Sequence, residues 1–433
     1  MPEAEAAPTA LAPASATNPE PPPAPARKRP RLFAPLSVRD FRFLWAGEGV
    51  SILGTQFHLV ALPWLVLQLT GSSVALGTVL MAAAIPRALL MLVGGALTDH
   101  FSPRTMMLIS NAGRGVLSTI LALLIATHQI HLWHLYVIPA LFGTFDALFY
   151  PAYQSILPRL LPQESLPAGN ALMQATIQTA MLAGPAPAGA LIAAFSLAWA
   201  FGIDAASFVV AVAMLLLIAA QAGAVAHAAR KNMLHSIAEG ARYVNHDRPL
   251  RGFVLMACGL NLTVTGPFMV GMPLLAKGRF ANWGGGSLAY GIMFSAFGAG
   301  ALIGGLSAGS IRTVRRPGLF MVFVMLLIAV GMAVLGYVPW LWVCAAMMMA
   351  MGIGVGVANI SNITWIQKRP EPQMLGRVMS VMMFGGLGLV PVSMAVAGVI
   401  ANFGVQVLFG TSAAAIAAVA VLAGLAKPVR EIR

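Results

Sequence analysis

The 433-residue sequence has few charged residues, since Asp, Glu, Lys and Arg together make up only 9% of it. Soluble domains carry about 25% charged residues, so a chain this poor in charge does not expose its surface mainly to water. Hydrophobic residues make up 59%, and several apolar stretches reach the about 20 residues that a helix needs to cross a bilayer. The composition excludes an ordinary soluble domain and indicates an integral membrane protein.

Cysteine and catalytic motifs are also scarce. Cys258 and Cys344 each lie inside an apolar segment, where a free thiol usually behaves as a small hydrophobic side chain, so we expect neither a disulfide nor a metal site. The sequence contains no His-Glu-x-x-His pattern and no phosphate-binding Gly-x-x-x-x-Gly-Lys pattern, which argues against direct ATP hydrolysis. We expect no enzyme activity and no cofactor.

Acidic residues are outnumbered by basic ones, 13 against 26, giving a net charge of +13 and a pI near 10.7. A basic chain can bind nucleic acid, but here the basic residues fall in alternate loops, as in the cytoplasmic loops of membrane proteins. The predicted inner loops hold Arg104, Arg159, Arg230, Lys231, Arg242, Arg248, Arg251, Arg312, Arg315, Arg316, Lys368, Arg369 and Arg377, and the outer loops only Lys277 and Arg279. We therefore expect no nucleic-acid partner, and a multi-pass protein of the bacterial plasma (inner) membrane with both termini cytoplasmic.

Twelve apolar segments predict twelve spanning helices. They cover residues 43–69, 73–98, 105–127, 133–157, 168–194, 199–222, 252–275, 286–311, 317–338, 341–364, 375–400 and 404–426. The expected domains are a disordered Pro/Ala-rich cytoplasmic tail (1–40), an N-terminal six-helix bundle (41–222), a cytoplasmic linker (223–251), a C-terminal six-helix bundle (252–426) and a cytoplasmic tail (427–433). The first tail lacks the apolar core of a signal peptide.

Within the linker, apolar residues repeat at helical spacing at Leu234, Ile237, Ala241 and Val244. This pattern favours an amphipathic helix on the cytoplasmic surface. A plain solvated linker explains the same residues equally well, so both interpretations stay open.

The two halves look like repeats displaced by about 210 residues. The segment Val60–Pro63 corresponds to Val270–Pro273, the pair Gly94–Gly95 to Gly304–Gly305, and the loop around Pro162 to the loop around Pro370. Two six-helix repeats with a central site between them are typical of one large group of transporters.

The loop after the second predicted helix resembles the signature loop of the major facilitator superfamily. Gly95, Asp99 and Arg104 match the motif Gly-x-Leu-x-Asp-(Arg)-x-Gly-(Arg)-(Arg/Lys), whereas Ser102 and Pro103 depart from it. The resemblance implies that the aspartate contacts a helix end in the other half and stabilises the outward-open state. Helix N-termini attract carboxylates, so this gating role is physically reasonable.

The fifth predicted helix contains Gly184, Pro185, Ala188 and Gly189, similar to a Gly-Pro-x-x-Gly-Gly motif associated with exporters of this superfamily, with Ala188 in place of one glycine. A narrower likeness covers nearly the whole hydrophobic body, through residues 60–71, 146–152 and 204–208. It resembles the branch containing enterobactin-type siderophore exporters and macrolide or multidrug efflux proteins. The resemblance implies export but does not identify the substrate.

The charged residues that lie well inside the predicted spans are Glu48, Arg87, Arg114, Asp146 and Asp204, all in the N-terminal half. Each costs roughly 2.5–3.5 kcal/mol on insertion scales and therefore needs a partner or a function. We hypothesise that Asp146 carries the coupling proton, that Glu48 is the second candidate, and that Arg114 or Arg87 is the switching partner. A static buried ion pair is the competing explanation. Asp204, near the start of its helix, is expected to cap it.

Because facilitator-type folds line their cavity with helices 1, 4, 7 and 10, the resemblance places substrate near Gln56, His58, Asp146 and Tyr150. From the other half we expect Asn261, Phe268, Asn359 and Asn362. Apolar walls with few fixed charges suit hydrophobic or amphipathic cargo.

The sequence thus predicts an all-α integral membrane protein of about twelve helices with the major facilitator fold. We expect a monomeric, secondary-active and proton-coupled exporter whose partners are a small-molecule substrate, the lipid bilayer and protons. An uptake or facilitative carrier, and a non-coupled lipid-handling or signalling protein on the same scaffold, stay open as alternatives.

Overall fold

The computed structural model describes residues 33–97, 102–219, 233–308 and 317–426, and the regular elements within these ranges are all helical. A short 3-10 helix, η1 (Ala34–Ser37), comes first. The N-terminal half then contains α1 (Arg39–Thr70), α2 (Ser73–Leu97), α3 (Pro103–Ala126), α4 (Leu132–Leu160), α5 (Leu166–Ala183), α6 (Pro185–Ala194) and α7 (Leu197–Leu217). A separate helix, α8 (Met233–His246), follows.

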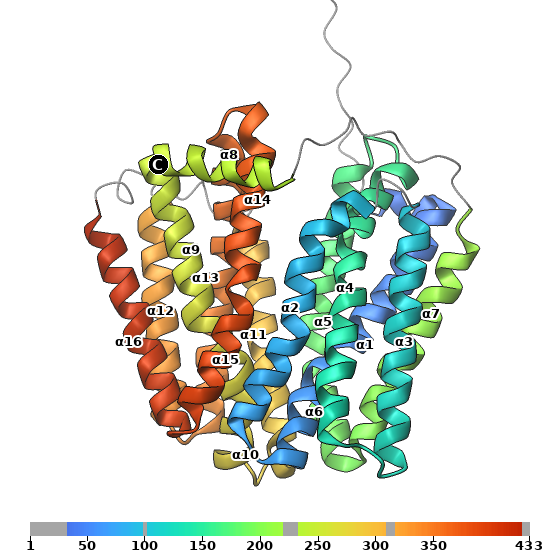
Figure 1. Ribbon diagram of the computed structural model, residues 1–433, viewed down its shortest axis with the longest axis vertical. Helices are drawn as coiled ribbons and strands as arrows, with labels where there is room; N and C mark the ends of the chain where they lie inside the picture. The colour runs from blue at the N-terminus through green and yellow to red at the C-terminus, as the bar shows by residue number, and fades with distance from the viewer. Residues whose placement is uncertain (1–32, 98–101, 220–232, 309–316, 427–433) are drawn as a thin grey trace, which may run out of the picture.

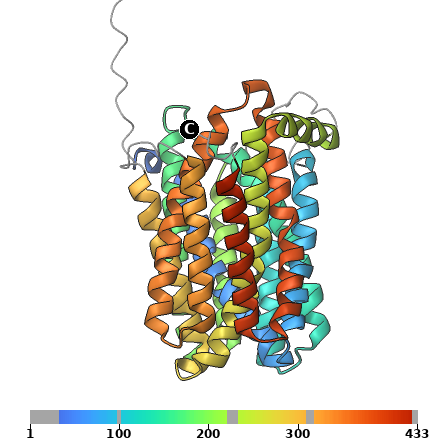
Figure 2. The same cartoon turned by 90° about the vertical axis from the view of Figure 1, so that its left-hand side faces the viewer.

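The C-terminal half begins with α9 (Arg248–Gly266), a π turn η2 (Pro267–Gly271) and α10 (Met272–Arg279). It continues with η3 (Gly284–Gly286), α11 (Ser287–Ala308), α12 (Pro317–Tyr337), α13 (Leu341–Lys368), α14 (Pro372–Gly388), α15 (Val390–Ala401) and α16 (Val405–Leu425). Figure 1 shows the two halves as bundles standing side by side, and the turned view in Figure 2 shows their helices running from one end of the molecule to the other.

Eleven segments of the described chain are long and apolar enough to cross a membrane, and a shorter apolar segment covers Gly385–Ala401. Together they match the twelve predicted spans, so the expected all-helical fold of two six-segment bundles is confirmed. The short segment falls in the predicted span 375–400, which the structure divides into α14 and α15.

Prolines divide three of the spans that the sequence analysis treated as single helices. Pro185 begins α6, Pro267 begins the π turn, and Pro391 lies at the start of α15. Proline lacks a backbone N–H and clashes with the preceding turn, so a helix that meets one often breaks or bends. Pro63 and Pro86 nevertheless lie inside the continuous helices α1 and α2, so proline alone did not predict which spans break.

Residues of the predicted linker form α8, which lies across one end of the C-terminal half (Figure 1). Val244 is buried, and Gly240 lies against the backbone of Arg377 on α14. Ion pairs join Glu239 to Arg377 at 3.0 Å and Asp247 to Arg369 at 2.9 Å. Within the described part of the linker, residues 233–246 are therefore helical, and this helix packs against the C-terminal half.

We call the end that carries α8 and the starts of α1 and α3 the α8 end, and the opposite end, which carries α10, the α10 end (Figure 1). Two similar hydrogen bonds join the halves near the α10 end. Ser73 Oγ on α2 donates to the carbonyl of Gly398 on α15, and Ser287 Oγ on α11 donates to the carbonyl of Gly189 on α6, both at 3.0 Å. Lys277 Nζ on α10 also donates to the carbonyl of Leu67 on α1 at 2.6 Å.

Glycine allows the two halves to approach backbone to backbone at these places. A Cβ atom on Gly77 of α2 would lie 2.6 Å from the carbonyl oxygen of Met394 on α15. A Cβ atom on Gly291 of α11 would meet the carbonyl oxygen of Pro185. Such small residues at helix interfaces are typical of membrane proteins, and here they bring the halves into contact near the α10 end.

Candidate functional site

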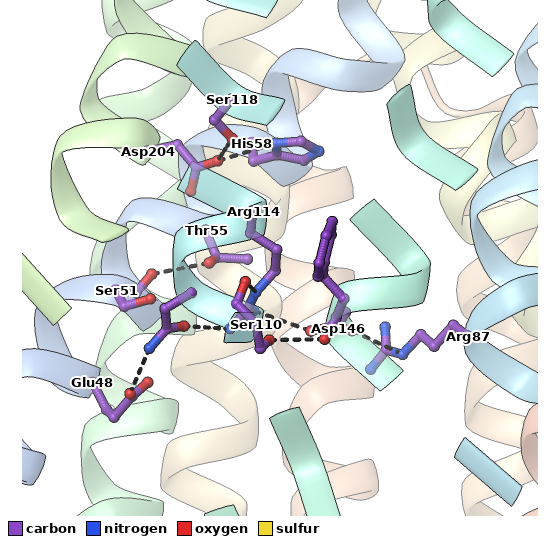
Figure 3. A network of polar contacts seen from close by, with 12 residues as sticks. Glu48, Ser51, Thr55, His58, Arg87, Ser110, Arg114, Ser118, Asp146 and Asp204 are labelled. Atoms are coloured by element: carbon purple, nitrogen blue, oxygen red, sulfur yellow. Dashed lines mark hydrogen bonds and ion pairs between the residues drawn. The ribbon is translucent and has the colours of Figure 1, made fainter. Parts of the chain in front are cut away.

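Asp146, near the middle of α4, is paired with two arginines from neighbouring helices (Figure 3). Arg87 Nε on α2 lies 3.0 Å from Oδ2, and Arg114 Nη1 on α3 lies 3.1 Å from Oδ1. Both carboxylate oxygens therefore have a cationic partner. The structure brings together three of the four residues that the sequence singled out for proton coupling.

Arg114 extends this contact into the interior of the N-terminal half. Its Nη2 donates to Asn111 Oδ1 at 2.6 Å, and its guanidinium lies over the rings of Phe149 and Phe208, 4.7 Å from each centroid. Arginine keeps its charge and stacks well on aromatic rings, so two rings and the oxygens of Ser110, Asn111 and Asp146 hold this side chain in place.

Glu48 on α1 completes the chain. Asn111 Nδ2 donates to Glu48 Oε1 at 2.9 Å, so Glu48, Asn111, Arg114, Asp146 and Arg87 form one continuous series across α1, α3, α4 and α2. We call this series the charged chain. Its formal charges alternate in sign along its length, which lowers the cost of placing four charged groups inside a bundle.

The two carboxylates of the charged chain differ in their contacts. Asp146 uses both oxygens in ion pairs, whereas Glu48 is 1% exposed and its Oε2 has no hydrogen-bond partner. A buried polar oxygen without a partner is costly, so Glu48 Oε2 is an oxygen that can take up a proton without breaking a contact.

Helical spacing explains why these residues meet. On α1, Glu48, Ser51, Thr55 and His58 recur every three or four residues, and the α3 residues Asn111, Arg114 and Ser118 do the same. Residues at this spacing share one face of a helix. We call the polar contact surface that these two faces form, together with Asp204 on α7, the polar seam (Figure 3).

At the other end of the polar seam lies a second cluster. Asp204 Oδ2 accepts a hydrogen bond from Ser118 Oγ at 2.5 Å and lies 3.1 Å from His58 Nδ1. The expectation that Asp204 caps its helix is wrong, because α7 begins at Leu197 with Ser196 as the N-cap residue. His58, expected beside the substrate, is buried inside the N-terminal half.

The other expected cavity residues lie at scattered positions. Gln56 is buried beside Gly184, and Tyr150 is 46% exposed on α4, where its hydroxyl accepts a hydrogen bond from Gln154. In the C-terminal half, Phe268 is buried against Phe294 and Phe297. Asn261 is half-buried on α9 and donates to the carbonyl of Ala257, Asn359 is exposed on α13, and Asn362 is half-buried one turn further on. Their substrate contacts stay a prediction.

The loop motif is only partly described. Gly95 lies in the last turn of α2, and Asp99 lies outside the described residues. Arg104 donates to the carbonyls of Leu215 and Leu216, at 2.8 and 3.0 Å. These carbonyls end α7, so within the described residues Arg104 caps a helix of its own half.

The exporter-type motif lies where α5 meets α6. Gly184 is the residue between the two helices, Pro185 begins α6, and Gly189 accepts the hydrogen bond from Ser287 of the other half. In addition, the backbone N–H of Ala186 donates to Ser295 Oγ on α11 at 3.0 Å. The motif therefore breaks its helix and forms part of the contact between the halves.

One motif escaped the sequence search. Residues 305–309 have the pattern Gly-x-Ser-x-Gly, which in hydrolases forms a turn between a strand and a helix. Here Ser307 lies in the last turn of α11 and donates to the carbonyl of Gly304. The helical setting does not fit a hydrolase nucleophile.

Comparison with known proteins agrees with this architecture. Residues 31–432 match the model of a family described as transmembrane secretion effector. The enterobactin exporter EntS of Shigella boydii serotype 18 (strain CDC 3083-94 / BS512) is 25% identical over 339 residues, covering 78% of this chain and 79% of the relative. The enterobactin exporter EntS of Escherichia coli O1:K1 / APEC matches to the same extent.

Two solved structures share the fold. The crystal structure of the nucleoside transporter NupG superposes with a TM-score of 0.69 at 15% identity, covering 89% of this chain and 98% of that one. A bacterial homologue of the human lysosomal transporter Spinster superposes with a TM-score of 0.62 at 13% identity, covering 91% and 95%.

The fold and these similarities define a multi-pass membrane transporter of the major facilitator superfamily, and they point to transporters rather than to enzymes. Within that superfamily, the chain belongs to the transmembrane secretion effector family.

Proposed function

We propose that this transporter is a proton-coupled exporter of small hydrophobic or amphipathic molecules that works by alternating access. The family description and the exporter relatives support the outward direction. The charged chain carries the proton-coupling part of the proposal, because ionisable residues inside a membrane bundle are costly and commonly mark substrate or ion pathways.

Within the charged chain, we assign the proton to Glu48 and the role of switching partner to Asp146. A proton on Glu48 Oε2 breaks no contact, whereas a proton on Asp146 displaces Arg87 or Arg114. Protonation of Glu48 also leaves the chain with one more positive than negative charge. The rearrangement that follows is transmitted through Asn111 and Arg114 to Asp146.

Arg87 is the most exposed member of the charged chain. Its side chain is 53% exposed near the middle of α2, and exposure to lipid at that depth costs several kcal/mol. We therefore place its exposed part in a water-accessible path, where it meets the cargo. When Arg87 binds cargo it releases Asp146, and the charged chain passes this change on to Glu48. Cargo binding is thereby coupled to the proton on Glu48.

The cytoplasmic side, in this proposal, is the α8 end. Arg39, Arg42, Arg159, Arg248 and Arg251 lie there, and positive charge marks cytoplasmic loops. The hydrogen bonds that join the halves near the α10 end support a state closed toward the outside, in which cargo is loaded from the cytoplasm.

The test is ethidium transport in proteoliposomes that contain the full chain and carry a pH gradient. We expect gradient-driven ethidium transport in the wild type, its loss in Glu48→Gln, and retention in the control Glu164→Gln, which alters an exposed residue. We also expect Glu48→Gln to retain ethidium exchange without a gradient, because coupling is lost and the transport path is kept.

If transport stays gradient-driven in Glu48→Gln but not in Asp146→Asn, Asp146 rather than Glu48 carries the coupling proton. Transport that ignores the gradient in the wild type indicates a facilitative carrier and overturns proton coupling.

A further inference from the structure

The cluster of His58, Ser118 and Asp204 is not used by the mechanism proposed above. Asp204 is fully buried, and its Oδ2 receives both the Ser118 hydroxyl and His58 Nδ1, whereas Oδ1 has no partner. In a bilayer-embedded bundle an aspartate with one unpartnered oxygen is costly. Such a residue needs either a bound proton or a charged partner.

Among the described residues, His58 is the only basic side chain in direct contact with Asp204. Helices α1, α3 and α6 pack against α7. The other ionisable group of the polar seam on α1 is Glu48, and on α3 it is Arg114, which bonds to Asn111 and Asp146. Helix α6 has no ionisable residue. On α4, Asp146 is paired with its two arginines.

Aromatic rings hold the His58 imidazole in place. Phe142 of α4 stacks on it with ring centroids 4.3 Å apart, and Phe201 of α7 meets it edge-on at 5.3 Å. His58 is 4% exposed, so these neighbours enclose its ring. With Nδ1 of His58 directed at Oδ2, the oxygen of Asp204 that stays open to an added proton is Oδ1.

The cluster lies at a different depth from Glu48. Ten residues of α1 separate Glu48 from His58, which is about 15 Å of helix. Ser51 and Thr55 lie between them on the same face, and on α3 Arg114 and Ser118 are one turn apart. The polar seam therefore has a carboxylate with an unpartnered oxygen at each end, Glu48 toward the α8 end and Asp204 toward the α10 end.

We propose that His58 and Asp204 form a second proton-binding site, which takes up and releases a proton independently of Glu48. Its place in a transport cycle rests on the proposed function, but its protonation does not. The pair gains one proton from solvent and returns it, and no other group is consumed. Ser118 positions the carboxylate by its hydrogen bond and does not exchange a proton.

The test is an infrared pH titration of the purified full-length protein in lipid nanodiscs, following the C=O stretch of protonated carboxyl groups. No cargo is needed. We expect Asp204→Asn to lose one titrating component that Glu48→Gln keeps, and Glu48→Gln to lose the other. An Asp204→Asn variant that keeps every titrating component of the wild type overturns the second site.

A second variant tests the pair even if Asp204→Asn fails to fold. His58→Gln keeps the carboxylate and a hydrogen-bond donor but removes the imidazole, so the Asp204 component should remain and its midpoint should move. The Glu48 component should stay where it is. An Asp204 component with an unchanged midpoint in His58→Gln overturns the pairing. Ethidium transport that ignores the pH gradient in the wild type, by contrast, overturns the proton coupling of the proposed function and leaves this titration result standing.

Discussion

Replacing Gly77 with alanine introduces a single methyl group at the contact between α2 and α15. That Cβ would lie 2.6 Å from the carbonyl oxygen of Met394 and 2.8 Å from Cα of Gly398. Ordinary contacts between heavy atoms lie near 3.5–4.0 Å, so the two helices must separate by about 1 Å. Both obstructing atoms belong to the backbone, so no side-chain rotation relieves the clash.

The cost falls on the state in which the halves are joined at the α10 end. Overpacking a close contact costs typically 1–3 kcal/mol, and a state with these helices apart does not incur it. At 1.4 kcal/mol per factor of ten, the population should shift about 5- to 150-fold toward states open at the α10 end. The direction of the shift follows from the location of the methyl group, and its size from how far α15 can yield.

The measurement is the distance between spin labels on cysteines placed at the exposed residues Leu69 and Asn402, in a background with Cys258 and Cys344 replaced by alanine. We expect Gly77→Ala to populate longer distances than the parent protein. Gly202→Ala on α7 is the matched control, because a Cβ there meets nothing within 4 Å. A Gly77→Ala distance distribution identical to that of the parent would refute the reasoning, as would an equal shift in Gly202→Ala.

Three further predictions follow from the contacts of single residues. Arg114→Lys should reduce gradient-driven ethidium transport at least tenfold, because lysine does not reproduce the contacts with Asn111 and Asp146. Each of these is a charged hydrogen bond worth about 1.5–3 kcal/mol. Full transport in this variant contradicts a coupling role for the charged chain. Lys277→Met removes the hydrogen bond from Lys277 Nζ to the Leu67 carbonyl, but that carbonyl keeps its bond from the N–H of Gly71. The variant should therefore lengthen the same spin-label distance less than Gly77→Ala does. An unchanged distance shows that Lys277 does not hold the halves together. Arg377→Gln should lower the unfolding free energy by no more than about 1 kcal/mol, because its ion pair with Glu239 is partly exposed. Thermal unfolding of the purified variant measures this change, and a larger loss of stability contradicts a surface role for the pair.

The number and length of the apolar segments predicted an all-helical membrane protein of about twelve spans, because bilayer thickness fixes the length of a spanning helix. The major facilitator fold itself was implied by the resemblance of the loop and helix motifs. Breaks within spans were not predictable from proline alone. Pro185 ends one helix and begins another, whereas Pro63 lies inside α1. The difference depends on the neighbouring chain, since Ser295 of α11 accepts the N–H that the break frees at Ala186.

The candidate site was partly visible in the sequence. Ionisable residues inside spans are rare enough to single out Glu48, Arg87, Arg114 and Asp146. Asn111 escaped notice because a neutral amide gives no comparable signal, although it joins Glu48 to Arg114. The pairing of His58 with Asp204 also escaped notice. Helical spacing shows which residues share a face of one helix, but not which face of another helix they meet.

The two serine contacts near the α10 end form a symmetric pair. Ser73 and Ser287 each begin the second spanning helix of their half, and each donates to a glycine in the fifth span of the other half. This reciprocal pattern is that of an isologous interface between identical subunits. In a dimer of one ancestral half, a single serine would make both bonds, and losing it would remove both. In this chain the two serines are separate residues, so each bond can be lost without the other, and the two contacts can differ in strength.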